Sequence, residues 1–333
     1  MDRRDFLNKG AGVLVAAGLG GLTSVPSFAQ NIEEKDYKPG EGVTGPLKVR
    51  FLGTGAADWN GRDERGELRR LTSALLDDRV LIDFTPTDED MIPAGIHPEV
   101  IFYTHSHGDH YNPAAALKLG VKRVYLGSSW IERARSDFDK ASSESGLPVP
   151  EIVPLSPGDK ASAFGLTFTA LPANHATGDR KEQTMMYLVE KKDVRVLYAT
   201  DTGGIPAIAA RIAGIDPHEK GNPITGIIME ATMGIDGDED FRIFTHSSVK
   251  TVERIVHMLI REGRYLPKLN QPVYLTHMAR TLHPTQTELD ATLPAPLRPL
   301  TTASKSSSLR HHLIQILIMQ KKQAGQSDRP VAM

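Results

Sequence analysis

Four apolar runs in this chain each lead into side chains that can bind a metal ion, and this recurrence restricts the fold more than any other feature. The run "VIFYT" leads into "HSHGDH" (residues 105–110), which holds three of the chain's twelve histidines. Three later runs lead to His175, Asp201 and His277. A polar loop would account for the first cluster of histidines, but not for the three later residues. Because strand carboxyl ends in layered α/β proteins commonly meet at one active edge, the recurrence predicts that architecture with a metal site at the edge.

The spacing inside the first cluster suits two ions. In extended backbone, residues two apart face the same way, so His105 and His107 can bind one ion together. The chain then turns toward the next expected helix, which directs Asp109 and His110 toward a second ion. No single tetrahedral ion can use all of these ligands, but two ions can share them.

The remaining apolar patterns predict two groups of strands, each with helices after it. Alternating residues predict a half-buried strand at 47–53. Hairpins are expected over 73–84, turning at Asp77-Asp78, and over 184–201, turning at 191–193. This order favours layers of helices and strands around one core.

Three helix starts have recognisable signals. Asn112-Pro113 has the form of an N-cap followed by proline at the first helical position. Ser129 and Glu132 have the spacing of a capping box. The stretch 247–263 predicts an amphipathic helix with four apolar side chains on one face, which are Val249, Val252, Val256 and Leu259.

Composition excludes several kinds of protein. The chain has no cysteine, so it has no disulfide, thiolate metal site or cysteine nucleophile, and any metal must be bound by histidines and carboxylates. The formal net charge of -2 gives no basic surplus for nucleic acid or anionic membranes. We therefore expect a small-molecule substrate and no nucleic-acid partner.

The first 29 residues have the features of an export signal. Arg3–Arg4 precede an uncharged Gly/Ala-rich run, and small residues follow up to Ala29. This segment resembles a twin-arginine signal cleaved after Ala29, which implies the translocation machinery as a partner and a periplasmic or secreted protein. A membrane anchor is the alternative, but the run is too short and glycine-rich to span well. No stable membrane association is expected after cleavage, and residues 30–46 read as a flexible leader.

The segment "THSHGDH" matches the HxHxDH signature of the metallo-β-lactamase superfamily, and the order of the later ligands matches as well. The resemblance covers about residues 47–285 and rests on five separated segments. It implies a single α/β domain, an αββα four-layer sandwich over residues 47–290, with a dinuclear centre of zinc, manganese or iron.

The same resemblance assigns roles to individual residues. It implies that the first metal is held by His105, His107 and His175. It implies that Asp109, His110 and His277 hold the second metal and that Asp201 bridges the two. Asp83, in "VLIDF", matches an early aspartate that orients a ligand histidine.

Three further segments narrow the resemblance to one branch. "FLGTGAADW", "MEAT" followed by "THSS", and "LTHMARTLHP" are similar to segments of tRNase Z and the phosphonate-operon cyclic phosphodiesterases. By this resemblance His246 lies beside the leaving group and assists its departure. The chain has His-Ser-Ser where that branch has His-Ser-Thr. The alternative for His246 is a structural role at a helix start.

These residues predict an exported metal-dependent hydrolase of phosphodiester bonds. Two divalent ions would lower the pKa of a shared water and supply hydroxide near neutral pH. Asp109 is expected to orient or accept the proton of the water, and His246 to donate to the leaving oxygen. The alternatives are a lactonase or β-lactamase, and a metal-binding or ligand-binding protein without turnover. The oligomeric state is open.

Three features outside the ligand set stay open at this stage. His283 is expected either to cap the following helix or to line the pocket, and Trp59 to pack or to contact substrate. The charged loop 60–70 is expected to be mobile. The tail 291–333 lacks a clear closing strand, and from about Leu297 onward it is interpreted either as the product of a shifted reading frame or as a helix.

Overall fold

The computed structural model describes residues 35–59, 62, 66, 69–218, 221–266, 272–293, 296–299 and 313–316. The expected signal segment, residues 1–29, lies outside these ranges, as do most of the charged loop 60–70 and most of the tail beyond residue 300. Among the described helices, none combines the length and apolar character needed to cross a bilayer.

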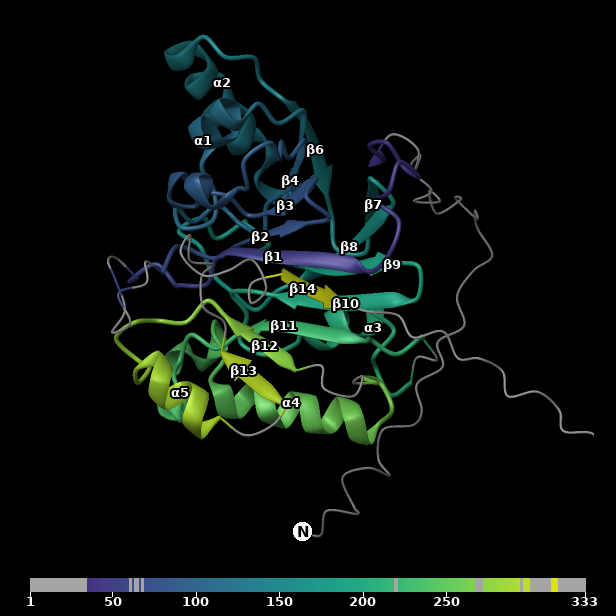
Figure 1. Cartoon of the computed structure of the whole chain (residues 1–333), viewed down its shortest axis with the longest axis vertical. Helices are drawn as coiled ribbons and strands as arrows, with labels where there is room; N and C mark the ends of the chain where they lie inside the picture. The colour runs from purple at the N-terminus through teal and green to yellow at the C-terminus, as the bar shows by residue number, and fades with distance from the viewer. Residues whose placement is uncertain are drawn as a thin grey trace, which may run out of the picture. The chain divides into compact units, whose positions relative to one another are not determined.

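The described residues form two seven-stranded mixed sheets (Figure 1). The first sheet has the order β14-β1-β2-β3-β4-β5-β6. Its strands are β1 (Leu47–Gly53), β2 (Ser73–Leu76), β3 (Val80–Ile82), β4 (Val100–Phe102), β5 (Arg123–Gly127), β6 (Glu151–Leu155) and β14 (Leu313–Ile316). The second has the order β13-β12-β11-β10-β9-β8-β7. Its strands are β7 (Lys160–Ala163), β8 (Leu166–Pro172), β9 (Met185–Lys191), β10 (Val194–Ala199), β11 (Gly226–Glu230), β12 (Val273–Thr276) and β13 (Leu297–Pro299).

Apolar side chains divide into three clusters that define four layers. The central cluster joins the two sheets, and Phe102 of β4 stacks there on Phe168 of β8 with ring centroids 3.8 Å apart. A second cluster packs the helices α1 (Pro113–Leu119) and α2 (Ile131–Ser145) onto the first sheet. The third packs the helices α3 (Ala207–Ile212), α4 (Val249–Arg261) and α5 (Gln286–Thr292) onto the second. The expected αββα sandwich is confirmed.

Most local predictions are also confirmed. Both hairpins form at the expected turns, with β2 paired to β3 and β9 paired to β10. The Asn112 side chain accepts a hydrogen bond from Ala115 N at 2.9 Å and caps α1, while Gly120 ends that helix in the left-handed conformation. All four apolar residues predicted for one face of α4 are buried.

The capping box expected at Ser129 is wrong. A 3₁₀ helix, Ser128–Trp130, comes first, and α2 begins at Ile131 without a side-chain cap. The Ser129 hydroxyl instead accepts a hydrogen bond from Gln183 N at 2.8 Å. The Ser129 hydroxyl, which the local spacing assigned to a helix cap, is therefore used by a residue that is distant in the sequence.

The tail contributes an edge strand to each sheet. β13 pairs parallel with β12, and β14 pairs antiparallel with β1. The helix interpretation of the tail is thus wrong for Leu313–Ile316, because the open edge of β1 offers hydrogen-bond partners to an extended segment. The sheets continue past residue 290, where we expected the catalytic domain to end.

Candidate metal centre

The structure brings all seven predicted ligands to one edge of the two sheets. His105 follows β4 by three residues, His175 follows β8, Asp201 follows β10, and His277 directly follows β12. Three site residues that follow strands have left-handed backbone, with φ of +56° at Asp83 after β3, +47° at Asp201 after β10 and +48° at His277 after β12. Such a conformation costs a non-glycine residue about 1–3 kcal/mol, and it is concentrated at functional sites. Here it turns three site side chains away from the strand direction.

The first predicted ligand set presents three nitrogen atoms to a common point. His105 Nε2 lies 3.0 Å from His107 Nδ1, and His175 Nε2 lies 3.2 Å from that same atom. The three ligand atoms fall within 4.8 Å of one another, as a single cation requires.

The second predicted set lies beside the first. His110 Nε2 and His277 Nε2 are 3.1 Å apart, and Asp109 Oδ2 is 3.5 Å from each. Asp201 lies between the sets, with Oδ2 at 2.8 Å from His110 Nε2 and Oδ1 at 3.9 Å from His175 Nε2. Its two oxygens therefore face different ligand sets, which is the placement that a bridging carboxylate needs.

Hydrogen bonds around the centre decide which nitrogen of each histidine faces inward. Four histidines use Nδ1 to donate outward, namely His105 to Thr104 Oγ1, His110 to Asp83, His175 to Thr245 O and His277 to Thr232 Oγ1. Their Nε2 atoms then carry lone pairs toward the centre. Lone pairs about 3 Å apart repel one another and cannot hydrogen-bond. The donor set therefore fits divalent cations, and zinc binds to imidazole and carboxylate ligands of this kind.

Two buried relays support the ligand histidines. Asp83 accepts from His110 Nδ1 at 2.8 Å and from Thr104 Oγ1 at 2.8 Å, while Thr104 Oγ1 accepts from His105. Asp83 thus contacts a predicted ligand histidine, as expected, and through Thr104 it reaches one histidine of each predicted set. Glu230 accepts from the Thr232 hydroxyl, which accepts from His277.

Glu182 joins two ligand loops. Its buried carboxylate accepts from Ser106 N at 2.8 Å and from Ser106 Oγ at 2.5 Å. It also accepts from Thr177 Oγ1 at 2.9 Å. Ser106 lies between the ligands His105 and His107, and Thr177 lies two residues after His175. One carboxylate therefore fixes the three histidines of the first set relative to one another.

His246 lies next to the ligands and is held by carboxylates. Its Nδ1 is 3.2 Å from both oxygens of Glu230 and 3.4 Å from Asp201 Oδ1. Burial lowers the pKa of His246, but the charges of Glu230 and Asp201 outweigh burial and raise this pKa to about 9. Ser248 caps the following helix α4, as the structural alternative for His246 also expected. The contacts with Glu230 and Asp201, and not the cap, place His246 at the candidate site.

The two acidic ligands are held in their charged form. Burial alone would raise the pKa of Asp201, but the positive charges of protonated His277 and His110 bring this pKa well below its usual value. Asp109 has a lowered pKa for the same reason, since His110 and His277 outweigh its burial. Burial lowers the pKa of His110, but Asp201, Asp109 and Asp83 outweigh it and raise this pKa well above its usual value, so bound cations would have to replace a proton there. Burial lowers the pKa of His105, which keeps its imidazole neutral and able to bind a cation.

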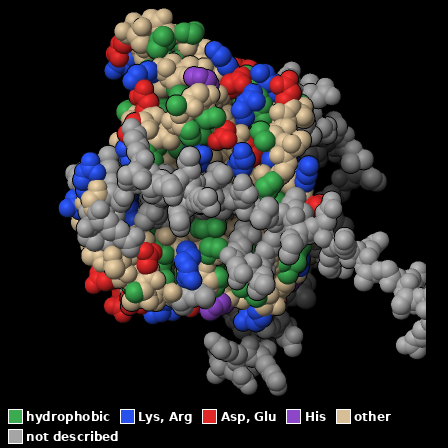
Figure 2. All heavy atoms as spheres, in the orientation of Figure 1, with side chains coloured by type: hydrophobic (Ala, Val, Ile, Leu, Met, Phe, Trp, Pro, Cys, Tyr) green, Lys and Arg blue, Asp and Glu red, His purple; other side chains and the backbone are tan. Residues whose placement is uncertain are grey.

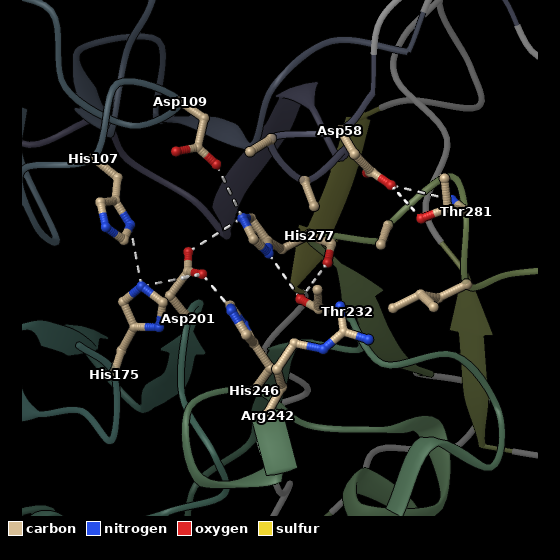
Figure 3. Close-up of a pocket in the computed structure, with 14 residues that line it drawn as sticks. Asp58, His107, Asp109, His175, Asp201, Thr232, Arg242, His246, His277 and Thr281 are labelled. Atoms are coloured by element: carbon tan, nitrogen blue, oxygen red, sulfur yellow. Dashed lines mark hydrogen bonds and ion pairs between the residues drawn. The ribbon is translucent and has the colours of Figure 1, made fainter. Parts of the chain in front are cut away.

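A cavity of about 330 Å³ opens onto the centre. Figure 3 shows His107, Asp109, His175, Asp201, His246 and His277 around it, together with Asp58, Thr232, Arg242 and Thr281. His105 and His110 are fully buried and do not line it. The remaining lining residues are Ala56, Ala57, Ala279 and Leu282.

Two other residues that sequence analysis left open have packing roles. His283 donates from Nε2 to Ala231 O at 2.5 Å and is absent from the cavity wall, while Thr285 caps the next helix. Trp59 packs under Arg69, whose guanidinium lies 4.3 Å from the ring centroid. These contacts give neither His283 nor Trp59 a direct role in the chemistry of the site.

The sequence by itself points to no role for Glu182, Glu230, Thr232 and Arg242. Glu230 belongs to the quoted "MEAT" segment, so that segment could have indicated it. Glu182 lies in a polar loop and Arg242 in the 3₁₀ helix Phe241–Phe244, neither with a motif, and only their contacts distinguish them.

Comparison with known proteins agrees with this geometry. A model of the beta-lactamase superfamily domain matches residues 79–217, which include every predicted ligand except His277. Over these residues the chain is similar to that family. No curated protein sequence matches it.

Solved structures share the metallo-β-lactamase fold at low sequence identity. YhfI from Bacillus subtilis, a metallo-beta-lactamase fold protein, has a TM-score of 0.54 and 14% identity, covering 78% of this chain and 98% of its own. The short form of human tRNase Z has a TM-score of 0.51 and 17% identity, covering 72% and 95%. Zn²⁺-bound PqqB from Methylobacterium extorquens has a TM-score of 0.54 and 14% identity, covering 76% and 97%. These structures show the fold that the chain shares, and the His/Asp groups at its sheet edge are placed so that they could hold metal ions.

Proposed function

We propose that this protein hydrolyses phosphodiester bonds with two divalent cations, zinc being the first candidate, held by the seven residues described above. The observation that carries the proposal is His246 beside the bridging Asp201. An alkoxide released from a phosphodiester is a poor leaving group and needs a proton. His246 Nδ1 is occupied by Glu230, and Nε2 has no acceptor among the described residues, so it can donate to a substrate oxygen.

Each side chain has a distinct task in this reaction. Two cations bound here would activate a water molecule and draw negative charge from the phosphoryl oxygens. Asp109 orients or accepts the proton of the attacking water. Asp201 holds the two ligand sets at a fixed separation. Glu230 keeps His246 protonated and oriented, since both carboxylate oxygens lie 3.2 Å from Nδ1.

The test is hydrolysis of bis(4-nitrophenyl) phosphate by the purified protein, with and without chelator, beside a lactone and a β-lactam. We expect turnover of the phosphodiester that chelation abolishes and Zn²⁺ restores. Faster turnover of the lactone or β-lactam would assign the centre to carbonyl chemistry. Stoichiometric metal without turnover of any substrate would indicate a binding protein.

We also propose that the protein is exported through the twin-arginine pathway and acts outside the cytoplasm. The support is the Arg3–Arg4 pair and the small residues before Ala29. Replacing both arginines by lysine should leave folded precursor in the cytoplasm, measured by fractionation. Normal export of the double variant would contradict the proposal.

A further inference from the structure

The 3₁₀ helix η5 (Phe241–Phe244) is fixed beside the metal centre, although it contributes no predicted ligand. The Arg242 carbonyl accepts a hydrogen bond from His246 N at 2.8 Å. The carbonyl of Thr245, directly after η5, accepts from the ligand His175 at 3.2 Å. The backbone that carries Arg242 is therefore held in place by two residues of the site.

Asp240 holds the Arg242 side chain in one orientation. Asp240 Oδ1 accepts from Arg242 N at 2.9 Å and from Nε at 3.0 Å, and Oδ2 accepts from Nη2 at 2.7 Å. A bidentate contact of this kind fixes the plane of a guanidinium. Nothing in the part of the chain that the structure describes accepts a hydrogen bond from Nη1. The N–H groups of Nη1 are therefore oriented and available to an anionic ligand.

The charge of Arg242 acts on the cavity. Arg242 forms part of the cavity wall, near His246 and Thr232 (Figure 3). The hydrogen bonds with Asp240 raise the pKa of Arg242, and the negative charge of Asp58, which lines the same cavity, also raises it. The guanidinium is therefore a permanent positive charge within the electrostatic reach of another cavity residue.

Asp58 does not compete with a ligand for the spare N–H groups of Arg242. Its carboxylate accepts from the Thr281 hydroxyl at 2.7 Å and from the backbone N–H groups of Arg280 and Thr281 at 3.0 and 3.1 Å. Among the described residues, the one carboxylate that pairs with Arg242 is that of Asp240. The cavity side of Arg242 thus has no competing anion from the described chain.

The protein surface as a whole does not attract anions. The formal net charge is -2, and the face in Figure 2 shows Lys and Arg side chains interspersed with Asp and Glu. Arg242 is the one Lys or Arg side chain among the described residues that line the cavity. A preference for a negatively charged substrate must therefore come from groups in the cavity, which are the metal centre and Arg242.

We propose that Arg242 binds an anionic oxygen of the substrate and makes the cavity selective for charged esters over neutral ones. A phosphodiester carries its negative charge on two non-bridging oxygens, and either oxygen can accept from Nη1 of Arg242. A phosphotriester or a lactone has no such charge, so it gains little from this contact. The proposal rests on the proposed phosphodiesterase function and deepens it by naming the residue that selects the charge of the substrate.

The kinetic test compares two substrates with the same leaving group, methyl 4-nitrophenyl phosphate, which is an anion, and dimethyl 4-nitrophenyl phosphate, which is neutral. Arg242→Gln should lower kcat/KM for the anionic diester about 10-fold, because a charged hydrogen-bond donor is lost from a partly exposed side chain. The value for the neutral triester should change by less than about 2-fold. Arg135→Gln is the matched control, since Arg135 on α2 is also exposed and pairs with a carboxylate, that of Glu132 at 2.8 Å. Equal losses for the two esters in Arg242→Gln would overturn the proposal.

A binding measurement separates this proposal from the proposed function. Dimethylphosphinate and trimethylphosphine oxide have similar tetrahedral shapes and no ester bond, but only the phosphinate is charged. Both are titrated calorimetrically into the zinc-loaded wild type and Arg242→Gln. Bound cations favour the phosphinate in both proteins, so the quantity that tests Arg242 is the change in this preference on substitution.

We expect the preference for the phosphinate to be about 10-fold smaller in Arg242→Gln than in the wild type. An unchanged preference, or no measurable binding of the phosphinate by the wild type, would overturn the role of Arg242 whether or not phosphodiesters are cleaved. The expected loss of preference in a protein that hydrolyses no phosphodiester would support the role of Arg242 and contradict the proposed function alone.

Discussion

Replacing Asp83 by asparagine should weaken metal binding without removing any ligand. Asp83 Oδ1 accepts from Thr104 N at 2.8 Å, and Oδ2 accepts from both Thr104 Oγ1 and His110 Nδ1 at 2.8 Å. In asparagine, the oxygen can keep the backbone bond, and the amide NH₂ then meets two donors. His110 can accept from that NH₂ only by moving its own proton to Nε2, the nitrogen that should bind the metal.

The expected size follows from this change of tautomer. Loss of a group that orients a ligand histidine typically lowers metal affinity about 10- to 100-fold, or about 1.4–2.7 kcal/mol. The second set should lose more than the first, because His110 contacts Asp83 directly while His105 does so through Thr104. The substitution also leaves buried hydrogen-bonding groups around Asp83 without partners. Each such group lowers the free energy of unfolding by about 1–3 kcal/mol, so the metal-free protein should unfold more easily.

The assay is metal content after dialysis against graded chelator, with elemental analysis of each fraction. The variant should lose the ion of the second set at a lower chelator concentration than the wild type does. It should lose the ion of the first set only at a higher chelator concentration. Asp139→Asn, on the exposed face of α2, is the matched control and should behave as wild type. If Asp83→Asn retains both ions with wild-type affinity, Asp83 does not set the tautomer of His110 and the relay described here is incorrect.

Three further predictions follow from the same contacts. Asp201→Ala should lower the affinity for both ions, since its oxygens face both ligand sets; elemental analysis that finds one ion still tightly bound would contradict the bridge. His246→Ala should slow alkyl leaving groups by roughly 10²–10⁴ and nitrophenyl ones much less, measured as kcat for a leaving-group series, and equal losses would make His246 structural. Glu182→Ala should weaken binding of the first ion in particular and lower the free energy of unfolding by about 1–3 kcal/mol, because Ser106 N loses its hydrogen-bond partner. Metal titration and chemical denaturation measure these two effects. Wild-type values in both assays would show that Glu182 does not have this role.

Local sequence patterns were enough to indicate the metal centre. Each of the four ligand-bearing segments comes after an apolar run, and strand runs are recognisable because burial on both faces requires continuous apolar residues. The N-cap at Asn112 and the apolar face of α4 depend only on neighbours within a few residues, and both were correct. Spacing separated His105 and His107 from Asp109 and His110, and the family resemblance added the assignment of His175, Asp201 and His277 to these two sets.

The tertiary structure decided everything that depends on residues distant in the chain. Ser129 was assigned to a helix cap by spacing, but Gln183 N uses it. The carboxylate of Glu182 joins Ser106 across 76 positions, and neither residue has a local signal of that contact. The edge strand β14 forms because β1 offers unpaired backbone groups, which the tail sequence itself does not show.

The orientation of the ligand histidines also depends partly on the sequence and partly on the tertiary structure. The sequence determined that imidazoles stand at the strand ends, because a strand places its next residues at the sheet edge. It did not determine which nitrogen faces inward. That choice depends on outer acceptors such as Asp83, Thr232 and Thr245, two of which follow strands and one a 3₁₀ helix. Hydrogen bonds act over about 3 Å, so only a folded chain can bring these acceptors to the rings and so set the chemistry of the centre.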